Sequence, residues 1–368
     1  MRRPGEDAVL DLHRRLVATP SVSGSERAAA DLVTAWLEAR GLRAARLGDT
    51  VVALAGSGPL LLLDSHLDTV PPAPGWRRNP FGAEAVGGRV YGLGANDAKA
   101  SVAAMTAAFV ALAGEPLGLT LGLALVAGEE TRSHGTRDAL DHLAAGRLPL
   151  AAAVFGEPTG LDLAVAQKGL LVLELAAAGR AAHAAHAQKL GAPNAARRLA
   201  RDLVALDGVD LGPEHPVLGP VTVEPTVVAA GSARNVVPAE ATAVLDVRTT
   251  PSLAPAAVVE RLRGAVAGEV RILSDRFSPC ETPAGSALLA AARAARPGAR
   301  EYGSATLSDW ALLPAGVPGL KAGPGVSERS HTPDEYVLES EVLDGARFYE
   351  ALARAFAAEL GRGAEGAA

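Results

Sequence analysis

The sequence predicts an α/β protein that has a mostly parallel central sheet with flanking helices, and a smaller ferredoxin-like α+β domain inserted into it. Short apolar runs that fit buried strands alternate with segments of helical periodicity in the first part of the chain. After about residue 168 the order changes to β, α, β, β, α, β, which is typical of a ferredoxin-like domain. From about residue 283 the first pattern resumes. We therefore expect one domain over 1–169 and 280–368, and a second domain over 170–279.

The first domain is expected to begin with two helices. Apolar residues at helical spacing predict a helix over 7–18. Ser23 and Glu26, three positions later, form a capping-box pattern at the start of a second helix, and Gly41 is expected as its C-cap. The elements that follow are expected as strands at 43–55 and 60–63, a helix at 97–113, a strand at 119–126, a helix at 136–144 and a strand at 150–155.

The inserted domain is predicted from a second set of alternating segments, and the chain then returns to the first domain. A last helix over 339–359 closes that domain. The segments of the insertion are a strand at 170–178, a helix at 194–206, strands at 220–230 and 240–248, a helix at 254–267 and a strand at 269–274.

The composition excludes several classes of protein. The 368 residues are 49% hydrophobic and 21% charged, which is typical of a globular chain with a large core. A net charge of −6, from 35 basic and 41 acidic residues, gives no electrostatic footprint for nucleic acid. The apolar runs are shorter than the ~18–20 residues that a membrane helix needs. One cysteine, Cys280, excludes an intramolecular disulfide, and the N-terminal residues lack the pattern of a signal peptide, so we expect a cytoplasmic protein.

Acidic residues and histidines collect at the ends of the predicted strands. In an open parallel sheet, ligands bind beyond the carboxyl ends of the strands, so these side chains are expected at one edge. Carboxylates packed together raise one another's pKa unless a cation compensates. Carboxylate and imidazole ligands suit Zn²⁺ and its first-row neighbours. The candidates are His66 and Asp68 after the strand at 60–63, Asp97 at a helix start, Glu129 and Glu130 after 119–126, and Glu157 after 150–155.

Each of these motifs also has an ordinary structural explanation. A His-x-Asp pair is commonly part of a turn, two adjacent glutamates commonly lie on the surface, and Glu-Pro after a strand commonly belongs to a loop. The glycines Gly87, Gly88, Gly92 and Gly94 suggest a phosphate loop, but they match neither the dinucleotide fingerprint nor the P-loop pattern. The coincidence of several acidic groups on one edge is what favours a metal site.

Six segments, in order along the chain, together resemble the M20 family of dinuclear zinc amidohydrolases. One segment alone is weak evidence, but six at compatible spacing cover nearly the whole chain. The resemblance implies a zinc-peptidase-like catalytic domain and makes the insertion a lid that carries the dimer interface. The segments are DSHLDTVPP (64–72), W-x-x-NPF (76–81), GLGANDAKA (92–100), AGEE (127–130), FGEPT (155–159) and GPGVSERSHTPDEYV (323–337).

The resemblance also implies roles for the residues at the strand ends. Two divalent ions are implied, with Zn²⁺ expected and Co²⁺ or Mn²⁺ as alternatives. By this resemblance, His66 and Glu157 bind one ion, Glu130 and His331 bind the other, Asp97 bridges both, Asp68 orients His66 and Glu129 is the general base.

The inserted segment GRAAHAAHAQKLGAPNAA (179–196) resembles the part of the family's lid whose histidine reaches the partner's active site. This implies a homodimer and an oxyanion-stabilising role for His183, while the nearby His186 is interpreted as a surface residue. Asn235 matches the lid asparagine, and Arg248 matches the arginine that binds the substrate carboxylate, although an arginine in a strand is often part of a structural ion pair. Gly323 belongs to a loop that borders the substrate in the family.

The resemblance implies hydrolysis of the amide bond of a small N-acyl amino acid, with no nucleic-acid or membrane partner. The C-terminal motif favours N-acetylornithine, cleaved to ornithine and acetate in amino-acid biosynthesis. The pair Ser308-Asp309 resembles desuccinylases of N-succinyl-diaminopimelate and hydrolases of carrier-protein-linked lysine or ornithine. Acetylcitrulline deacetylases and di- or tripeptidases are further alternatives. A non-catalytic scaffold is disfavoured because every ligand position and Glu129 are present.

Overall fold

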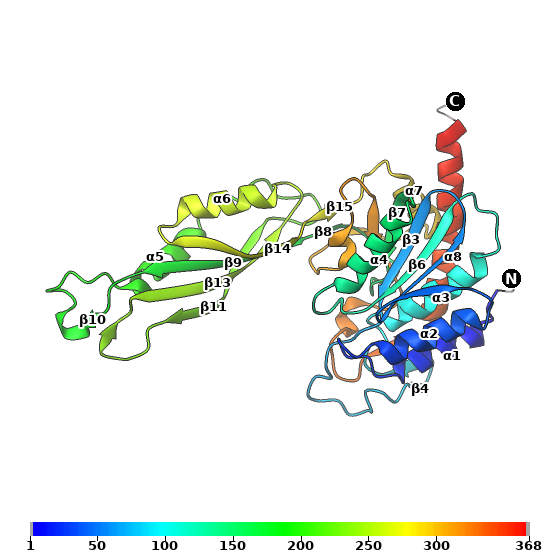
Figure 1. Ribbon diagram of the computed structural model, residues 1–368, viewed down its shortest axis with the longest axis horizontal. Coiled ribbons are helices and arrows are strands. Elements are labelled where there is room, and N and C mark those ends of the chain that lie inside the picture. Colours follow the sequence, from blue (N-terminus) through cyan, green and yellow to red (C-terminus); the bar gives the residue numbers. More distant parts are fainter. Residues whose placement is uncertain (1–2, 366–368) are drawn as a thin grey trace. The chain divides into compact units, whose positions relative to one another are not determined.

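The computed structural model describes residues 3–365, so the ends of the predicted first domain, 1–2 and 366–368, lie outside it. The chain divides into two compact units (Figure 1). Unit 1 holds the described residues up to Val165, Glu281–Tyr302 and those from Ser308 onward. Unit 2 holds Ala166–Cys280 and Gly303–Leu307. The predicted insertion at 170–279 lies within a few residues of the longer segment, whereas the short return of 303–307 to unit 2 was not predicted.

Unit 1 is built on a nine-stranded, mixed sheet. Its central strand β3 pairs in parallel with β6 on one side and with β7 on the other, and β17 pairs in parallel with β7. The first two strands, β1 and β2, form an antiparallel edge. The path is β1(Ala44–Leu47), β2(Thr50–Gly56), β6(Thr120–Val126), β3(Leu60–His66), β7(Leu150–Phe155), β17(Gly319–Lys321), β8(Leu163–Gln167) and β15(Cys280–Glu281), with β16(Glu301–Ser304) beside β8.

Helices cover both faces of this sheet (Figure 1). Five helices share one hydrophobic core with strand residues such as Leu63 and Leu123, and α4(His134–Ala145) packs against β1, β2 and β6. The alanine-rich α3 is buried along nearly its whole length, as expected for a helix that is apolar all round. The five helices are α1(Glu6–Val17), α2(Arg27–Glu38), α3(Lys99–Leu112), α7(Ala287–Ala295) and α8(Glu339–Glu365).

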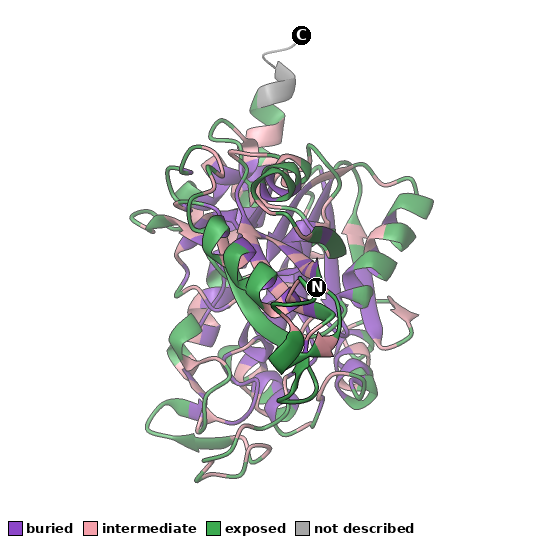
Figure 2. Ribbon diagram, turned by 90° about the vertical axis from the view of Figure 1, so that its left-hand side faces the viewer, coloured by how far each residue is buried: buried purple, intermediate pink, exposed green. Residues whose placement is uncertain are grey.

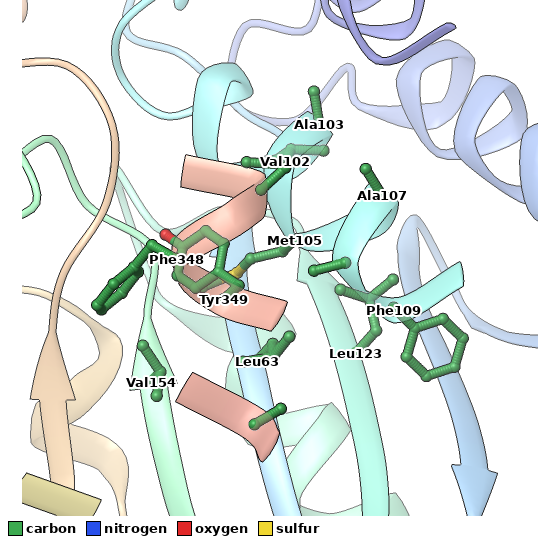
Figure 3. Close-up of a cluster of buried hydrophobic side chains, with 14 of the residues drawn as sticks. Leu63, Val102, Ala103, Met105, Ala107, Phe109, Leu123, Val154, Phe348 and Tyr349 are labelled. Atoms are coloured by element: carbon green, nitrogen blue, oxygen red, sulfur yellow. The ribbon is translucent and has the colours of Figure 1, made fainter. Parts of the chain in front are cut away.

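The core of unit 1 is a continuous apolar layer between the sheet and these helices (Figure 3). Met105 and Phe109 of α3 lie beside Leu63 and Leu123 of the sheet, and Tyr349 of α8 lies against the same layer. The strands β3 and β6 are buried at every position. Figure 2 shows buried strands in the interior of the protein. This burial explains why β6 and the first four residues of β3 are largely apolar, without alternation.

A small sheet and three short 3₁₀ helices complete the fold. The strands β4(Glu84–Val86), β5(Arg89–Tyr91) and β18(Tyr336–Leu338) form a three-stranded antiparallel sheet that was not predicted. The 3₁₀ helices are η1(Ala184–His186), η2(Asp309–Leu312) and η3(Ser327–Arg329). Within the described residues, no helix is both long and apolar enough to cross a membrane.

Unit 2 has the predicted β, α, β, β, α, β order. Its four-stranded antiparallel sheet follows the order β11-β13-β9-β14, and alternate residues of β9 and β13 share a core with α5 and α6. The strand β11 is one edge of this sheet. The elements are β9(Gly169–Ala178), α5(Ala195–Leu206), β11(Thr222–Ala230), β13(Glu240–Thr249), α6(Pro255–Ala265) and β14(Glu269–Phe277), with a separate pair β10(Ala182–His183) and β12(Val236–Val237).

Two local predictions were wrong. The expected strand at 43–55 is a hairpin of two strands, because Gly48 turns the chain in the left-handed region at φ 63°. The capping box does not form. The hydroxyl of Ser23 donates to Asp68 Oδ2 at 2.7 Å, and the carboxylate of Glu26 accepts the amide of Gly24, so α2 begins at Arg27 without a side-chain cap.

Candidate metal centre

The parallel strands bring the predicted ligands to one edge of the sheet. His66 ends β3 and pairs with Val126, the last residue of β6, while Asp64 pairs with Phe155, the last residue of β7. The turns that follow β6 and β7 therefore deliver Glu129, Glu130 and Glu157 beside His66. This is the arrangement that the sequence predicted for the carboxyl ends of parallel strands.

Asp97 lies between the two histidines. Its Oδ1 is 3.2 Å from Nε2 of His66, and its Oδ2 is 3.7 Å from Nε2 of His331. His331 Nε2 also lies 2.8 Å from Glu130 Oε1. Donor atoms of His66, Asp97 and Glu130 all lie within 4.8 Å of one another. Asp97 thus has one imidazole near each of its two carboxylate oxygens, which is the geometry that a bridging ligand needs.

The acidic groups perturb one another strongly. Burial, together with the charge of Asp97, raises the pKa of Glu157 to about 8. Burial and the charges of Asp309 and Glu157 raise the pKa of Glu129 well above its usual range. The hydrogen bond to Glu130 raises the pKa of His331 to about 9. Each raised pKa favours the protonated form of its group. The cluster therefore has an excess of negative charge that a cation would neutralise.

The side chains present therefore fit a divalent metal ion. The donors are imidazole nitrogens and carboxylate oxygens, which suit Zn²⁺ and its first-row neighbours, and they converge on one edge of the sheet. Burial opposes protonation of His66, but its hydrogen bond to Asp97 and the surrounding carboxylates raise its pKa well above the usual range. A bound cation would remove that bias, because metal ligation needs the neutral imidazole.

The carboxylate of Asp68 holds the turn of the two glutamates. It accepts the backbone amides of Glu129 at 3.1 Å and Glu130 at 3.2 Å. Nδ1 of His66 instead lies 2.9 Å from the backbone carbonyl of Asp68, and the carboxylate oxygen is 3.7 Å away. Asp68 thus lies beside His66, as predicted. However, its backbone carbonyl orients the imidazole of His66, and its carboxylate orients the turn of Glu129 and Glu130.

Comparison with known proteins assigns the family. The sequence profile of Peptidase family M20/M25/M40 matches residues 62–355, which include all the candidate ligands. The chain belongs to the M20 peptidase family. It is therefore a metal-dependent hydrolase.

Similar proteins agree with this assignment. A succinyl-diaminopimelate desuccinylase of Parvibaculum lavamentivorans is 30% identical over 94% of this chain and 95% of its own length. A probable carboxypeptidase of Aspergillus terreus is 35% identical over 72% of this chain and 66% of its own length. The crystal structure of the Bacillus subtilis YXEP protein, described as a dinuclear metal-binding M20 peptidase, shares the fold. Its TM-score is 0.71 and its identity 19%, over 95% of this chain and 97% of that one.

Several residues of this M20 hydrolase that support the site were not predicted. The carboxylate of Glu335 accepts the backbone amides of Asn96 at 2.8 Å and Asp97 at 3.0 Å. Lys99, which is buried, donates to the carbonyl of Thr19 at 3.0 Å. Asp309, also buried, accepts the hydroxyl of Thr136 at 2.5 Å. These contacts join positions far apart in the sequence, so only Asp309 carried a signal, through its Ser-Asp motif.

The structure places Gly323 inside unit 1 of the hydrolase. Its amide donates to the hydroxyl of Thr159 at 3.1 Å, and it is buried. A Cβ at Gly323 would lie 2.5 Å from Ser101 Oγ and 2.6 Å from the carbonyl of Glu157. The glycine is therefore required for the close packing of the Glu157 loop, while its predicted contact with substrate stays a prediction.

The predicted residues of unit 2 lie in two places. His183 is exposed on β10, and the amide of the next residue, Ala184, donates to the carbonyl of Asn235 at 2.9 Å. Arg248 lies on β13 and forms a two-pronged ion pair with Asp246, at 2.7 and 3.0 Å. The exposed His186 has its ring 5.6 Å from that of His183. The structure brings His183 and Asn235 together and keeps Arg248 with an acidic neighbour.

Proposed function

We propose that the protein hydrolyses the amide bond of N-acyl amino acids. The observation that carries the proposal is the position of Glu129. Its carboxylate has no hydrogen-bonding partner among the described residues, and it adjoins the candidate ligand Glu130 on the turn that Asp68 holds. A free carboxylate of raised pKa beside a metal centre is suited to accept and return a proton.

We propose that two divalent ions, expected to be Zn²⁺, supply Lewis acidity and an acidified water when bound. His66 and Glu157 would hold one ion, Glu130 and His331 the other, and Asp97 would be shared. Glu129 would take the proton of the attacking water and pass it to the leaving amine. The amides that Asp68 accepts would keep Glu129 aimed at the reacting atoms during both transfers.

The substrate is proposed to carry a free carboxylate. Two candidates have specific support. The C-terminal motif favours N-acetylornithine, and the relatives named as desuccinylases favour N-succinyl-diaminopimelate. The relative named as a probable carboxypeptidase supports a peptide substrate as a second activity to test. N-Acetylcitrulline and substrates linked to a carrier protein are further candidates. Cytoplasmic location stays a prediction.

The lid residues are proposed to complete the chemistry. Arg248 would exchange its ion pair with Asp246 for the substrate carboxylate, which a guanidinium can bind in the same two-pronged way. Asn235, next to His183, and Gly323 would contribute to substrate binding. His183 would stabilise the oxyanion across a homodimer. An exposed apolar edge supports the dimer, since Val227 and Val228 of β11 are 57% and 58% exposed.

The test is amine release by the metal-reconstituted protein from N-acetylornithine, N-succinyl-diaminopimelate, N-acetylcitrulline, N-acetylmethionine and several dipeptides. A lead of tenfold in kcat/KM, about 1.4 kcal/mol, would identify the substrate class. Protein that binds two metal ions yet releases no amine from any of these would contradict the small-molecule proposal and favour a carrier-linked substrate. Protein that binds no metal would contradict the proposed centre itself.

A further inference from the structure

The side-chain amide of Asn96 crosses from the loop of Asp97 to the loop of His331. Its Nδ2 donates to the carbonyl of Val326 at 3.0 Å and lies 3.1 Å from Ser330 Oγ. Its Oδ1 accepts the amide of Val326 at 3.0 Å. One buried side chain therefore pairs with both ends of the segment 326–330, which directly precedes His331.

Asn96 is itself held rigidly. Its backbone amide donates to Oε1 of Glu335 at 2.8 Å, and the amide of Asp97 donates to the same oxygen at 3.0 Å. Glu335 is buried and lies just after His331 in the chain. The loop of Asp97 is thus fastened on both sides of His331, by Asn96 before it and by Glu335 after it.

His331 needs such support because of its backbone. Its φ of 59° lies in the left-handed region, which costs a residue other than glycine about 1–2 kcal/mol. Its imidazole is about half exposed, so burial contributes little to fixing it. The hydrogen bonds of Asn96 to Val326 and Ser330 hold the segment that leads into this conformation, together with the ion pair of Arg329 with Glu341.

Gly325 shows how closely the amide is packed. It has a φ of 79°, and a Cβ built at this position would collide with Oδ1 of Asn96. The loop therefore has glycine where the amide approaches its backbone. By contrast, Gly316 has a similar φ of 84° and no atom within 4 Å of such a Cβ.

We propose that Asn96 is a positioning residue that couples the two loops, so that Asp97 and His331 hold their separation of 3.7 Å and a metal ion can be shared between them. The inference rests on the proposed function, because it concerns the same metal centre. It assigns to Asn96 the task of positioning His331, which is proposed to bind one of the two ions together with Glu130. Substitution of a residue that orients a metal ligand commonly weakens metal affinity about 10- to 100-fold.

The experiment is a titration of the metal-free, full-length protein with Co²⁺, in which bound metal and the visible absorption spectrum are both recorded. Wild-type protein is expected to bind two equivalents. Asn96→Ala should bind one of the two equivalents about 10- to 100-fold less tightly, with altered absorption. Asn79→Ala is the matched control, because among the described residues the side chain of Asn79 accepts only the amide of Phe81, in a local turn at 3.0 Å. It should titrate as the wild type does.

The outcomes separate this inference from the proposed function. If the wild type binds two Co²⁺ ions and Asn96→Ala has the same affinities and spectrum, Asn96 is not a positioning residue, whatever happens to turnover. If the wild type binds no Co²⁺, the proposed metal centre is wrong and this inference is wrong with it. A loss of binding that Asn79→Ala shares would also overturn the inference.

Two further variants keep the test decisive if Asn96→Ala does not fold. Ser330→Ala removes one of the hydrogen bonds and should weaken the same Co²⁺ equivalent by a smaller factor. Gly325→Ala should displace the amide and weaken the same site, whereas Gly316→Ala, equally strained but without a neighbour, should not. Unchanged Co²⁺ binding in both Ser330→Ala and Gly325→Ala would overturn the inference.

Discussion

At the scale of single residues, the centre depends on groups that do not bind metal. Asp68 was predicted to orient His66, yet its carboxylate accepts the amides of Glu129 and Glu130 and the hydroxyl of Ser23. A carboxylate with three donors is fixed in place. Asp68 therefore joins the end of β3 to the turn after β6, and it positions the candidate base and its neighbouring ligand together.

The adjacent glutamates should respond differently to the same substitution. Glu129→Gln removes the group that accepts the proton, so we expect kcat to fall about 10²- to 10⁴-fold while two metal ions stay bound. Glu130→Gln removes a ligand, so we expect the protein to lose metal as well as turnover. Metal content and kcat are measured on the same samples. Retained turnover in Glu129→Gln, or retained metal in Glu130→Gln, would contradict the roles proposed for the two residues.

The candidate ligands could be named from the sequence, but their supporting residues other than Asp68 could not. His66 and Glu130 belong to short motifs at the ends of β3 and β6, which pair with each other, and Asp97 joins them from the start of α3. Asn96 reaches Val326 across 230 positions, and nothing near Asn96 in the chain indicates that partner. Hydrogen bonds between distant loops depend on the finished fold, so a local pattern does not predict them.

At the scale of elements, long apolar strands were predicted well, whereas the cap of one helix was not. The strand β7 occupies the predicted residues, because a run of apolar side chains needs a buried position whatever lies beside it. The capping box failed for the opposite reason. Ser23 has a stronger acceptor in the carboxylate of Asp68, which lies 45 positions away and becomes a neighbour only on folding.

The helix α1 supports the metal loop through a histidine. Nε2 of His13 lies 2.8 Å from the carbonyl of Ala95, next to Asn96, and the imidazole is fully buried. Burial lowers the pKa of His13 to about 4. Protonation would place a proton on Nδ1, which is buried and has no hydrogen-bonding partner in the described part of the chain. The neutral imidazole is therefore the form that the fold accepts.

His13 should make stability depend on pH in the acid range. Its folded pKa lies below the ordinary 6.5, so its contribution is complete above pH 6.5 and is lost as the pH falls through about 4. The full shift corresponds to about 3 kcal/mol. We expect His13→Gln to lower the melting temperature at pH 7.5. We also expect the melting temperature of this variant to fall less than that of the wild type between pH 6.5 and 4. His142→Gln, on the exposed side of α4, should leave both unchanged. Equal declines in wild type and His13→Gln would exclude this role.

At the scale of the whole molecule, the sequence indicated the insertion because the order of elements changes where the chain enters unit 2. The ferredoxin-like order β11-β13-β9-β14 follows from that succession of strands and helices. The return of 303–307 to unit 2 was missed, because five residues carry no periodicity of their own. A segment this short is assigned by its contacts rather than by its composition.

The edge strand β11 should decide the oligomeric state. It carries the exposed Val227 and Val228, and an apolar edge with free backbone groups favours pairing with a second copy. We expect the wild type to be a dimer in light scattering, and Val228→Lys to be a monomer because a charged side chain opposes edge pairing. Ile272→Lys, on the opposite edge strand β14, is the control, since Ile272 is also exposed, at 44%. It should remain a dimer.

The same variants test whether His183 acts on the partner's active site. If His183 donates to the oxyanion across the dimer, the Val228→Lys monomer should lose about 10²- to 10³-fold in kcat, as expected for one missing donor. Its metal content should match the wild type, because every candidate ligand belongs to unit 1. His183→Ala should stay dimeric and lose kcat to a similar extent. A fully active Val228→Lys monomer would show that each chain works alone and would remove the reason to expect His183 to act on a partner.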